Sequence, residues 1–98
     1  MKLTGKQKRE LRAMGHHLEP VLYFGKNGLE KSQYEAFEQA LLDHELIKVK
    51  LGKSSLIDIK ELVQLLESNT PAVCVQHIGR TALFYAPHPK KPKIKLPA

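Results

Sequence analysis

The sequence predicts an α/β fold in which amphipathic helices pack on one mixed four-stranded sheet, a two-layer α+β sandwich. Two observations predict it. Segments with apolar residues three and four positions apart alternate with short segments rich in β-branched and aromatic residues, in the order α-β-α-β-α-β-β. The last two strand segments are separated only by Gly79-Arg80, which is typical of a tight hairpin and adds an antiparallel pair. The 98 residues suffice for one domain.

The first helix is predicted over roughly residues 4–16. Thr4 is a suitable N-cap, and apolar residues recur at helical spacing around it, at Leu3, Leu11, Met14 and Leu18. Pro20 ends the helical pattern, and residues 21–24 are β-formers that predict a strand.

Helical spacing returns after Gly28 and ends at His44 or Glu45. Residues 46–51 then alternate, so that Lys48 and Lys50 are expected on a wet face and the apolar residues on a buried one. Ser55 is the expected N-cap of the third helix.

Residues 72–78 and 81–85 predict the closing hairpin, with Gly79 supplying the positive φ of a type II′ turn. Residues 87–98 contain four prolines and four lysines, which exclude a helix. The sequence therefore predicts a domain over residues 1–86 and a flexible basic tail over 87–98 that cannot pack a core.

The positive charge is concentrated at the two ends of the chain. The net charge is +6, to which residues 1–28 contribute +4, residues 29–78 contribute −3 and residues 79–98 contribute +5. An uneven basic surface favours a nucleic-acid partner. No segment approaches the roughly 20 apolar residues of a membrane span, and the single cysteine is consistent with a reducing cytoplasm.

The loop Gly25-Lys26-Asn27-Gly28 is the strongest functional candidate, because it joins a predicted strand to a predicted helix. Two glycines allow the backbone to approach a ligand, Lys26 adds a charge, and the N–H groups of a helix start suit a phosphate. KH modules hold single-stranded RNA with a G-x-x-G loop of this kind.

The sequence lacks the residue patterns that nucleotide hydrolysis, metal binding and catalysis require. Gly52-Lys53-Ser54 resembles the end of a P-loop, but Ile47 stands where the first glycine is required. The histidines and Cys74 show no ligand spacing, so we expect no metal, no cofactor, no small-molecule substrate and no catalytic residue. The six aromatic residues are predicted mostly in the core, so an aromatic stacking platform is not expected. These six residues are Tyr23, Phe24, Tyr34, Phe37, Phe84 and Tyr85.

Several short blocks together resemble the YhbY family of bacterial RNA-binding proteins, which are stand-alone CRM domains. The blocks are LR at 11–12, HHLEPV at 16–21, GKNGL at 25–29, HELIKVK at 44–50, QHIGR at 76–80 and LFY at 83–85. The resemblance covers roughly residues 2–86. It implies a fold like the C-terminal domain of translation initiation factor three, with strand order 1-2-4-3 and the fourth strand antiparallel to the rest.

The resemblance also implies a function and a site. The family associates with precursors of the large ribosomal subunit and assists their assembly. Its RNA surface corresponds here to the loop Gly25, Lys26, Asn27 and Gly28, to Lys8, Arg9, Arg12 and His16 of the first helix, and to Arg80 at the hairpin.

The function expected from these observations is a monomeric, non-enzymatic module that binds pre-ribosomal RNA by its phosphates. One alternative stays open. The acidic face of the second helix could serve a module that contacts ribosomal proteins without touching RNA.

Overall fold

The structure, a computed structural model, describes residues 2–25 and 29–98 and contains three helices and four strands in that part of the chain. Its elements are α1 (Gly5–Gly15), β1 (Pro20–Phe24), α2 (Lys31–His44), β2 (Leu46–Leu51), α3 (Ile59–Asn69), β3 (Val73–Ile78) and β4 (Thr81–Tyr85). They follow the predicted order. No helix in the described ranges is both long and apolar enough to cross a membrane.

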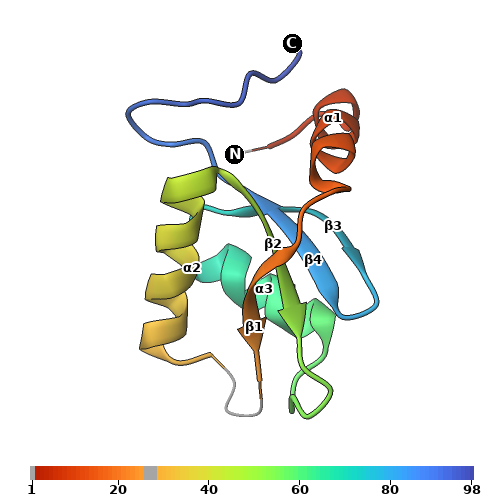
Figure 1. The fold of residues 1–98 in the computed structure, drawn as a ribbon, viewed down its shortest axis with the longest axis vertical. Helices are drawn as coiled ribbons and strands as arrows, with labels where there is room; N and C mark the ends of the chain where they lie inside the picture. Colours follow the sequence, from red (N-terminus) through yellow and green to blue (C-terminus); the bar gives the residue numbers. More distant parts are fainter. Residues whose placement is uncertain (1, 26–28) are drawn as a thin grey trace.

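The four strands form one mixed sheet in the order β1-β2-β4-β3. β1 runs parallel to β2, whereas β4 is antiparallel to both β2 and β3. Figure 1 shows α2 and α3 on one side of this sheet, and α1 on the other side near one end. The predicted fold class, strand order and direction of the last strand are confirmed.

Local hydrogen bonds explain where the helices and the hairpin begin. The Thr4 hydroxyl accepts from the Gln7 N–H at 3.1 Å while the Gln7 side chain accepts from the Thr4 N–H at 3.0 Å, which confirms the predicted cap of α1. The cap of α3 is Asp58, which accepts from the Glu61 N–H at 2.9 Å, so the expectation of Ser55 is wrong by three residues. In the hairpin, Gly79 has the predicted positive φ, 59°.

The main core lies between the sheet and the pair α2 and α3. Phe37 of α2 meets Phe84 of β4 edge to face, with ring centroids 5.1 Å apart. Ile47, Val49 and Leu51 point into this core, as their alternation predicts. Because these strand residues face the helices, Lys48 and Lys50 lie on the opposite face of the sheet.

A smaller cluster lies under α1, where Leu3 and Leu11 pack on Leu46, Val75, Leu83 and Tyr85. Gly15 sits so close to β4 that a Cβ placed there would be 2.5 Å from a methyl group of Leu83. The apolar stripe expected on this helix is only half buried, because Met14 and Leu18 remain 40% and 37% exposed. α1 therefore covers one end of its face of the sheet and leaves the rest open.

Glu45, directly after α2, is the one buried charged residue among the described residues. Its backbone has a φ of 64° and a ψ of −41°, a positive-φ conformation outside the left-handed helical region that costs a non-glycine residue on the order of 1 kcal/mol or more. Its carboxylate accepts three backbone hydrogen bonds, from His88 at 2.7 Å, Lys93 at 2.8 Å and Ile94 at 2.9 Å. These contacts attach residues 88–94 to the domain.

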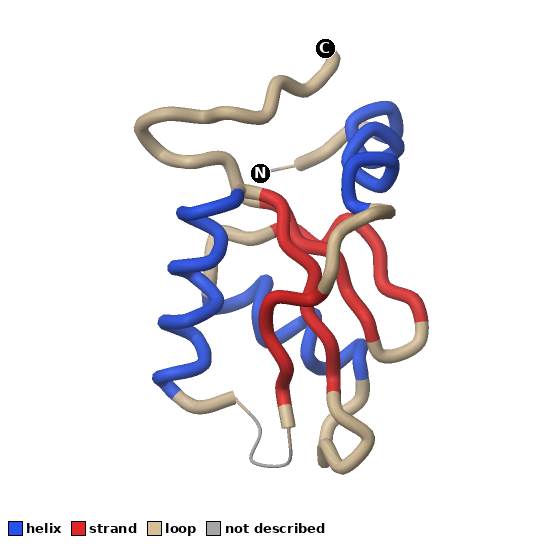
Figure 2. The backbone as a smooth tube through the Cα atoms, in the orientation of Figure 1, coloured by secondary structure: helices blue, strands red, loops and turns tan. Residues whose placement is uncertain are grey.

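The tail therefore differs from its prediction in one respect. It contains no helix or strand, as its prolines require, but Ile94 and Leu96 pack against the cluster under α1. The Gln7 side chain also donates to the Pro97 carbonyl at 3.0 Å. Figure 2 shows the tail running from the end of β4 towards α1. The sequence did not predict these contacts, because Glu45 was not identified as a partner for backbone N–H groups.

We predict that Glu45→Gln lowers the free energy of unfolding by about 2 kcal/mol, since an amide cannot replace a carboxylate that accepts three N–H groups. Urea denaturation measures the loss. Glu38→Gln, on the exposed face of α2, is the matched control and should change stability little. Equal stability of the two variants would contradict this role of Glu45.

The same carboxylate predicts a pH dependence. Desolvation raises the pKa of Glu45, but the N–H groups of His88, Ile94 and Lys93 and the charge of His88 outweigh it, so the pKa lies below its ordinary value. A lowered pKa contributes stability above the ordinary glutamate value of about 4.3, and the contribution disappears as the pH falls through the folded-state pKa. Wild type and Glu45→Gln should therefore converge in stability in acid, as measured by thermal unfolding between pH 7 and pH 2.

Candidate nucleic-acid interface

Three chain segments converge at the edge of the sheet where β1 and β2 end. The Gly52 N–H donates to the Phe24 carbonyl at 2.7 Å, and the Leu51 N–H donates to the Arg80 carbonyl at 2.7 Å. The start of the predicted loop at Gly25, the turn after β2 and the β3–β4 hairpin are thus neighbours. A Cβ on Gly52 would lie 3.4 Å from the Phe24 carbonyl oxygen and 3.7 Å from the Gly25 Cα.

The structure describes only the first residue of the G-x-x-G loop. Gly25 is half-buried directly after β1, whereas Lys26, Asn27 and Gly28 lie outside the described residues. The role predicted for these three residues stays a prediction. The helix after the loop begins at Lys31 and its N-cap is Glu30, an exposed carboxylate whose charge opposes a phosphate at this helix start. The N-terminus of α2 therefore attracts a phosphate less strongly than the loop pattern predicted.

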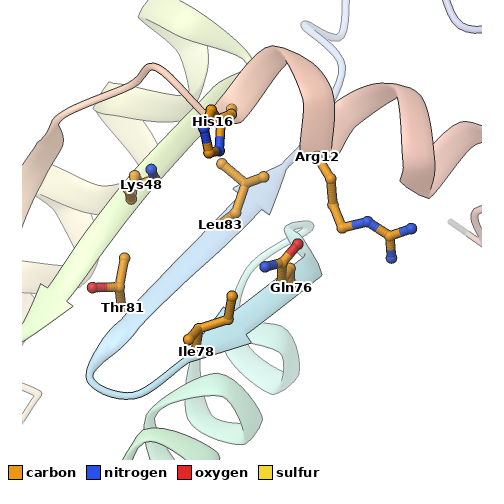
Figure 3. Close-up of a pocket in the computed structure, with 8 residues that line it drawn as sticks. Arg12, His16, Lys48, Gln76, Ile78, Thr81 and Leu83 are labelled. Atoms are coloured by element: carbon orange, nitrogen blue, oxygen red, sulfur yellow. The ribbon is translucent and has the colours of Figure 1, made fainter.

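A first hollow of about 160 Å³ lies where α1 meets the open face of the sheet. Figure 3 shows His16, directly after α1, and Lys48 of β2 beside Leu83, with Ile78 and Thr81 further along the hairpin strands. Arg12 also lines this hollow. His16 and Lys48 thus flank the Leu83 side chain, while Figure 3 shows the guanidinium of Arg12 directed away from them.

A second hollow, of about 600 Å³, lies at the edge of the sheet. Tyr23, Lys50, Lys53 and Arg80 line it, together with Thr81, which lines the first hollow too. The two hollows therefore form a continuous surface, which we call the basic strip. None of the described residues that line either hollow is acidic. Such a surface attracts an anionic ligand without a competing carboxylate.

The structure brings together only some of the basic residues predicted for the site. Arg12, His16 and Arg80 lie on the basic strip. Arg9 lines a different hollow, beside Lys95 and Leu96 of the tail. Lys8 is not among the described residues that line either hollow. Of the basic side chains predicted on the first helix, only Arg12 and His16 therefore line the basic strip.

Sequence reasoning missed Lys53 and Tyr23 as candidates for this surface. Tyr23 was expected in the core but is 66% exposed, because Leu22 and Phe24 on either side of it point into the main core. Strict alternation along β1 would have revealed this. The open-face positions of Lys48 and Lys50 were predicted from such alternation in β2.

No three histidine, cysteine, aspartate or glutamate side chains gather as a metal site within the described ranges. Cys74 is half-buried, and its N–H donates to the Glu67 carboxylate at 2.8 Å. Burial and the nearby Glu67 charge raise the pKa of the Cys74 thiol to about 11. The cysteine is thus a packing residue with a protonated thiol.

Comparison with known proteins assigns the chain to a family. The model of the CRS1/YhbY (CRM) domain matches residues 3–86, nearly the whole chain. The chain belongs to the CRM family. The resemblance drawn from the sequence blocks is therefore confirmed.

Individual relatives agree with this CRM assignment. Probable RNA-binding protein PA4753 of Pseudomonas aeruginosa is 43% identical over 95% of this chain and 89% of its own length. Probable RNA-binding protein YqeI of Bacillus subtilis is 36% identical over 97% of this chain and 99% of its own. The solution structure of the hypothetical protein SAV1595 from Staphylococcus aureus, proposed to bind RNA, superposes with a TM-score of 0.80 at 35% identity, covering 98% of this chain and all of that one.

We predict that Cys74 is alkylated by iodoacetamide at pH 8 on the order of 100-fold more slowly than a free thiol such as glutathione, because the thiolate is the nucleophile and a pKa of about 11 leaves little of it. The rate should rise as the pH approaches that value. Unfolding in urea should restore ordinary reactivity, and a native rate equal to that of glutathione would contradict the burial.

Proposed function

We propose that this CRM protein binds RNA on the basic strip and acts as a non-enzymatic binding module. The observation that supports the proposal most is the continuous hollow surface lined by Arg12, Lys48, Lys50, Lys53 and Arg80 with no acidic residue among its described lining. Cations spaced along a surface bind a phosphate backbone and release its condensed counterions. Relatives that are named RNA-binding proteins and align over nearly their whole length support the same function.

The RNA that we propose is a precursor of the large ribosomal subunit, whose assembly the protein would assist in the cytoplasm. This finer proposal rests on the resemblance to the YhbY proteins. It is tested by sedimenting a cell lysate on a sucrose gradient, with and without ribonuclease. Co-sedimentation with large-subunit precursors that is lost after ribonuclease treatment supports the proposal.

The protein-contact alternative has one observation in its favour. The carboxylates of α2 at Glu35, Glu38 and Asp43 are exposed, and α2 lies on the opposite side of the sheet from the basic strip. This side could contact a basic ribosomal protein. Co-sedimentation that survives ribonuclease treatment would favour this alternative over RNA binding.

We predict that the double variant Lys50→Gln and Arg80→Gln weakens RNA binding and lowers the slope of log Kd against log salt by about 1.4, since each phosphate contact on a single strand contributes about 0.7. Fluorescence anisotropy at several salt concentrations measures the slope. Lys60→Gln is the matched control, because Lys60 is exposed on α3, beyond the main core. A slope unchanged in the double variant would rule out these two contacts.

The loop is tested separately with Lys26→Glu, which we expect to weaken binding without lowering the thermal unfolding temperature. Wild-type affinity of this variant would exclude the loop residue while leaving the basic strip untouched.

A further inference from the structure

One row of side chains crosses the open face of the sheet from β1 to β3. Tyr23 is paired with Lys50, Lys50 with Thr81, and Thr81 with Ile78. Neighbouring strands lie about 4.8 Å apart, so the row spans on the order of 14 Å. Tyr23, Lys50 and Thr81 lie on the face away from the main core, because their chain neighbours Phe24, Val49 and Ala82 point into it. Ile78 lines the first hollow on the same face.

The two ends of the row are the most exposed apolar side chains in any strand of the described structure. Tyr23 is 66% exposed and Ile78 is 67% exposed, whereas α1 covers the other end of this face over Leu46 and Tyr85. Single exposed apolar residues are common on proteins. An aromatic ring beside three cations in one hollow is a more specific arrangement, and Tyr23 has Lys50, Lys53 and Arg80 around it.

We propose that the Tyr23 ring is a stacking position for one unpaired base of a single-stranded RNA segment that crosses the open face of the sheet. Lys50, Lys53 and Arg80 would hold the phosphates on either side of that base. The proposal rests on the RNA-binding function proposed above and adds to it the form of the RNA: an unpaired segment rather than a duplex.

Chemical complementarity favours a nucleotide as the occupant. The hollow of about 600 Å³ is within the 300–1,000 Å³ range of small-ligand sites. A base offers a flat apolar face to the ring and carries its negative charge on the backbone, which matches an aromatic residue flanked by cations. A base inside a duplex is already stacked on both sides, so only an unpaired base can lie on the ring.

The rest of the row suits the same ligand. Thr81, beside Lys50, offers a hydroxyl, and Gln76 in the adjoining first hollow offers an amide, both able to hydrogen-bond to a base edge or a 2′-hydroxyl. Lys48 and His16 line the first hollow, where α1 meets the open face of the sheet, and would contact the RNA segment there. An acidic peptide would satisfy the cations but would leave the Tyr23 ring without a planar partner.

The first experiment compares Tyr23→Ala and Tyr23→Phe with the wild-type full chain. The probe is a fluorescently labelled single-stranded oligouridine, paired with an abasic oligonucleotide of equal length that keeps the phosphates but lacks the bases. Loss of a base–aromatic stack predicts about 5- to 100-fold weaker binding of oligouridine by Tyr23→Ala, and near wild-type binding by Tyr23→Phe. Towards the abasic oligonucleotide, all three proteins should bind alike.

Leu42→Ala is the control for loss of an exposed apolar side chain, since Leu42 is 44% exposed on α2. It should bind oligouridine like wild type. Circular dichroism of each variant establishes that the fold is retained, which the exposure of Tyr23 leads us to expect.

The second measurement uses intrinsic fluorescence, because the chain has three tyrosines and no tryptophan. Of the three, Tyr85 is buried and Tyr34 half-buried, so a stacked base should quench mainly Tyr23. Oligouridine should reduce the tyrosine emission of wild type, and Tyr23→Phe should bind with equal affinity but with most of that quenching lost.

The outcomes separate the two proposals. Wild-type binding of oligouridine by Tyr23→Ala, or an equal loss for the abasic oligonucleotide, would overturn the stacking position while RNA binding on the basic strip stands. Binding of duplex RNA in preference to oligouridine, or of an acidic peptide at the same hollow in place of either RNA, would also overturn it. Failure of wild type to bind any RNA would overturn the proposed function itself.

Discussion

The unequal covering of the two faces of the sheet is the constraint on which the rest of the structure depends. α2 and α3 bury most of one face through residues such as Phe37, Leu62 and Phe84. α1 has only 11 residues, and Leu11 and Gly15 of this helix, with Leu3 before it, are buried on that side. Part of the second face is therefore exposed to solvent, and there the strands carry lysines and an aromatic ring without weakening the core.

Periodicity made most of the fold predictable from the sequence. The alternation of Ile47, Val49 and Leu51 with Lys48 and Lys50 defines which side of β2 is buried, and a one-residue error would reverse every side chain. Helix ends that rely on a side-chain cap, such as Thr4, are visible in the same way. The cap of α3 was misplaced because Ser55 and Asp58 are both good N-cap residues, and only packing of the preceding turn selects between them.

The candidate site was less predictable, because it depends on which residues from separate elements meet. Arg12 and His16 line the hollow beside the sheet while Arg9 lines the one beside the tail, and these groupings depend on where α1 packs, with Gly15 against Leu83. Tyr23 was misjudged from its aromatic character, although its position between two buried residues placed it outside. Glu45 gave no sequence signal of its own, since its partners are backbone groups more than 40 residues away along the chain.

The attachment of the tail through Glu45 has a consequence for how freely that segment can change in sequence. The carboxylate accepts only main-chain N–H groups, at positions 88, 93 and 94, while the prolines of this stretch stand at 87, 89 and 92, where no donor is needed. As far as the carboxylate is concerned, any residue with an N–H would serve at the three donor positions, although Ile94 also packs its side chain under α1. An added or deleted residue between the first and the second donor would misalign them, so this connection constrains the length of the segment.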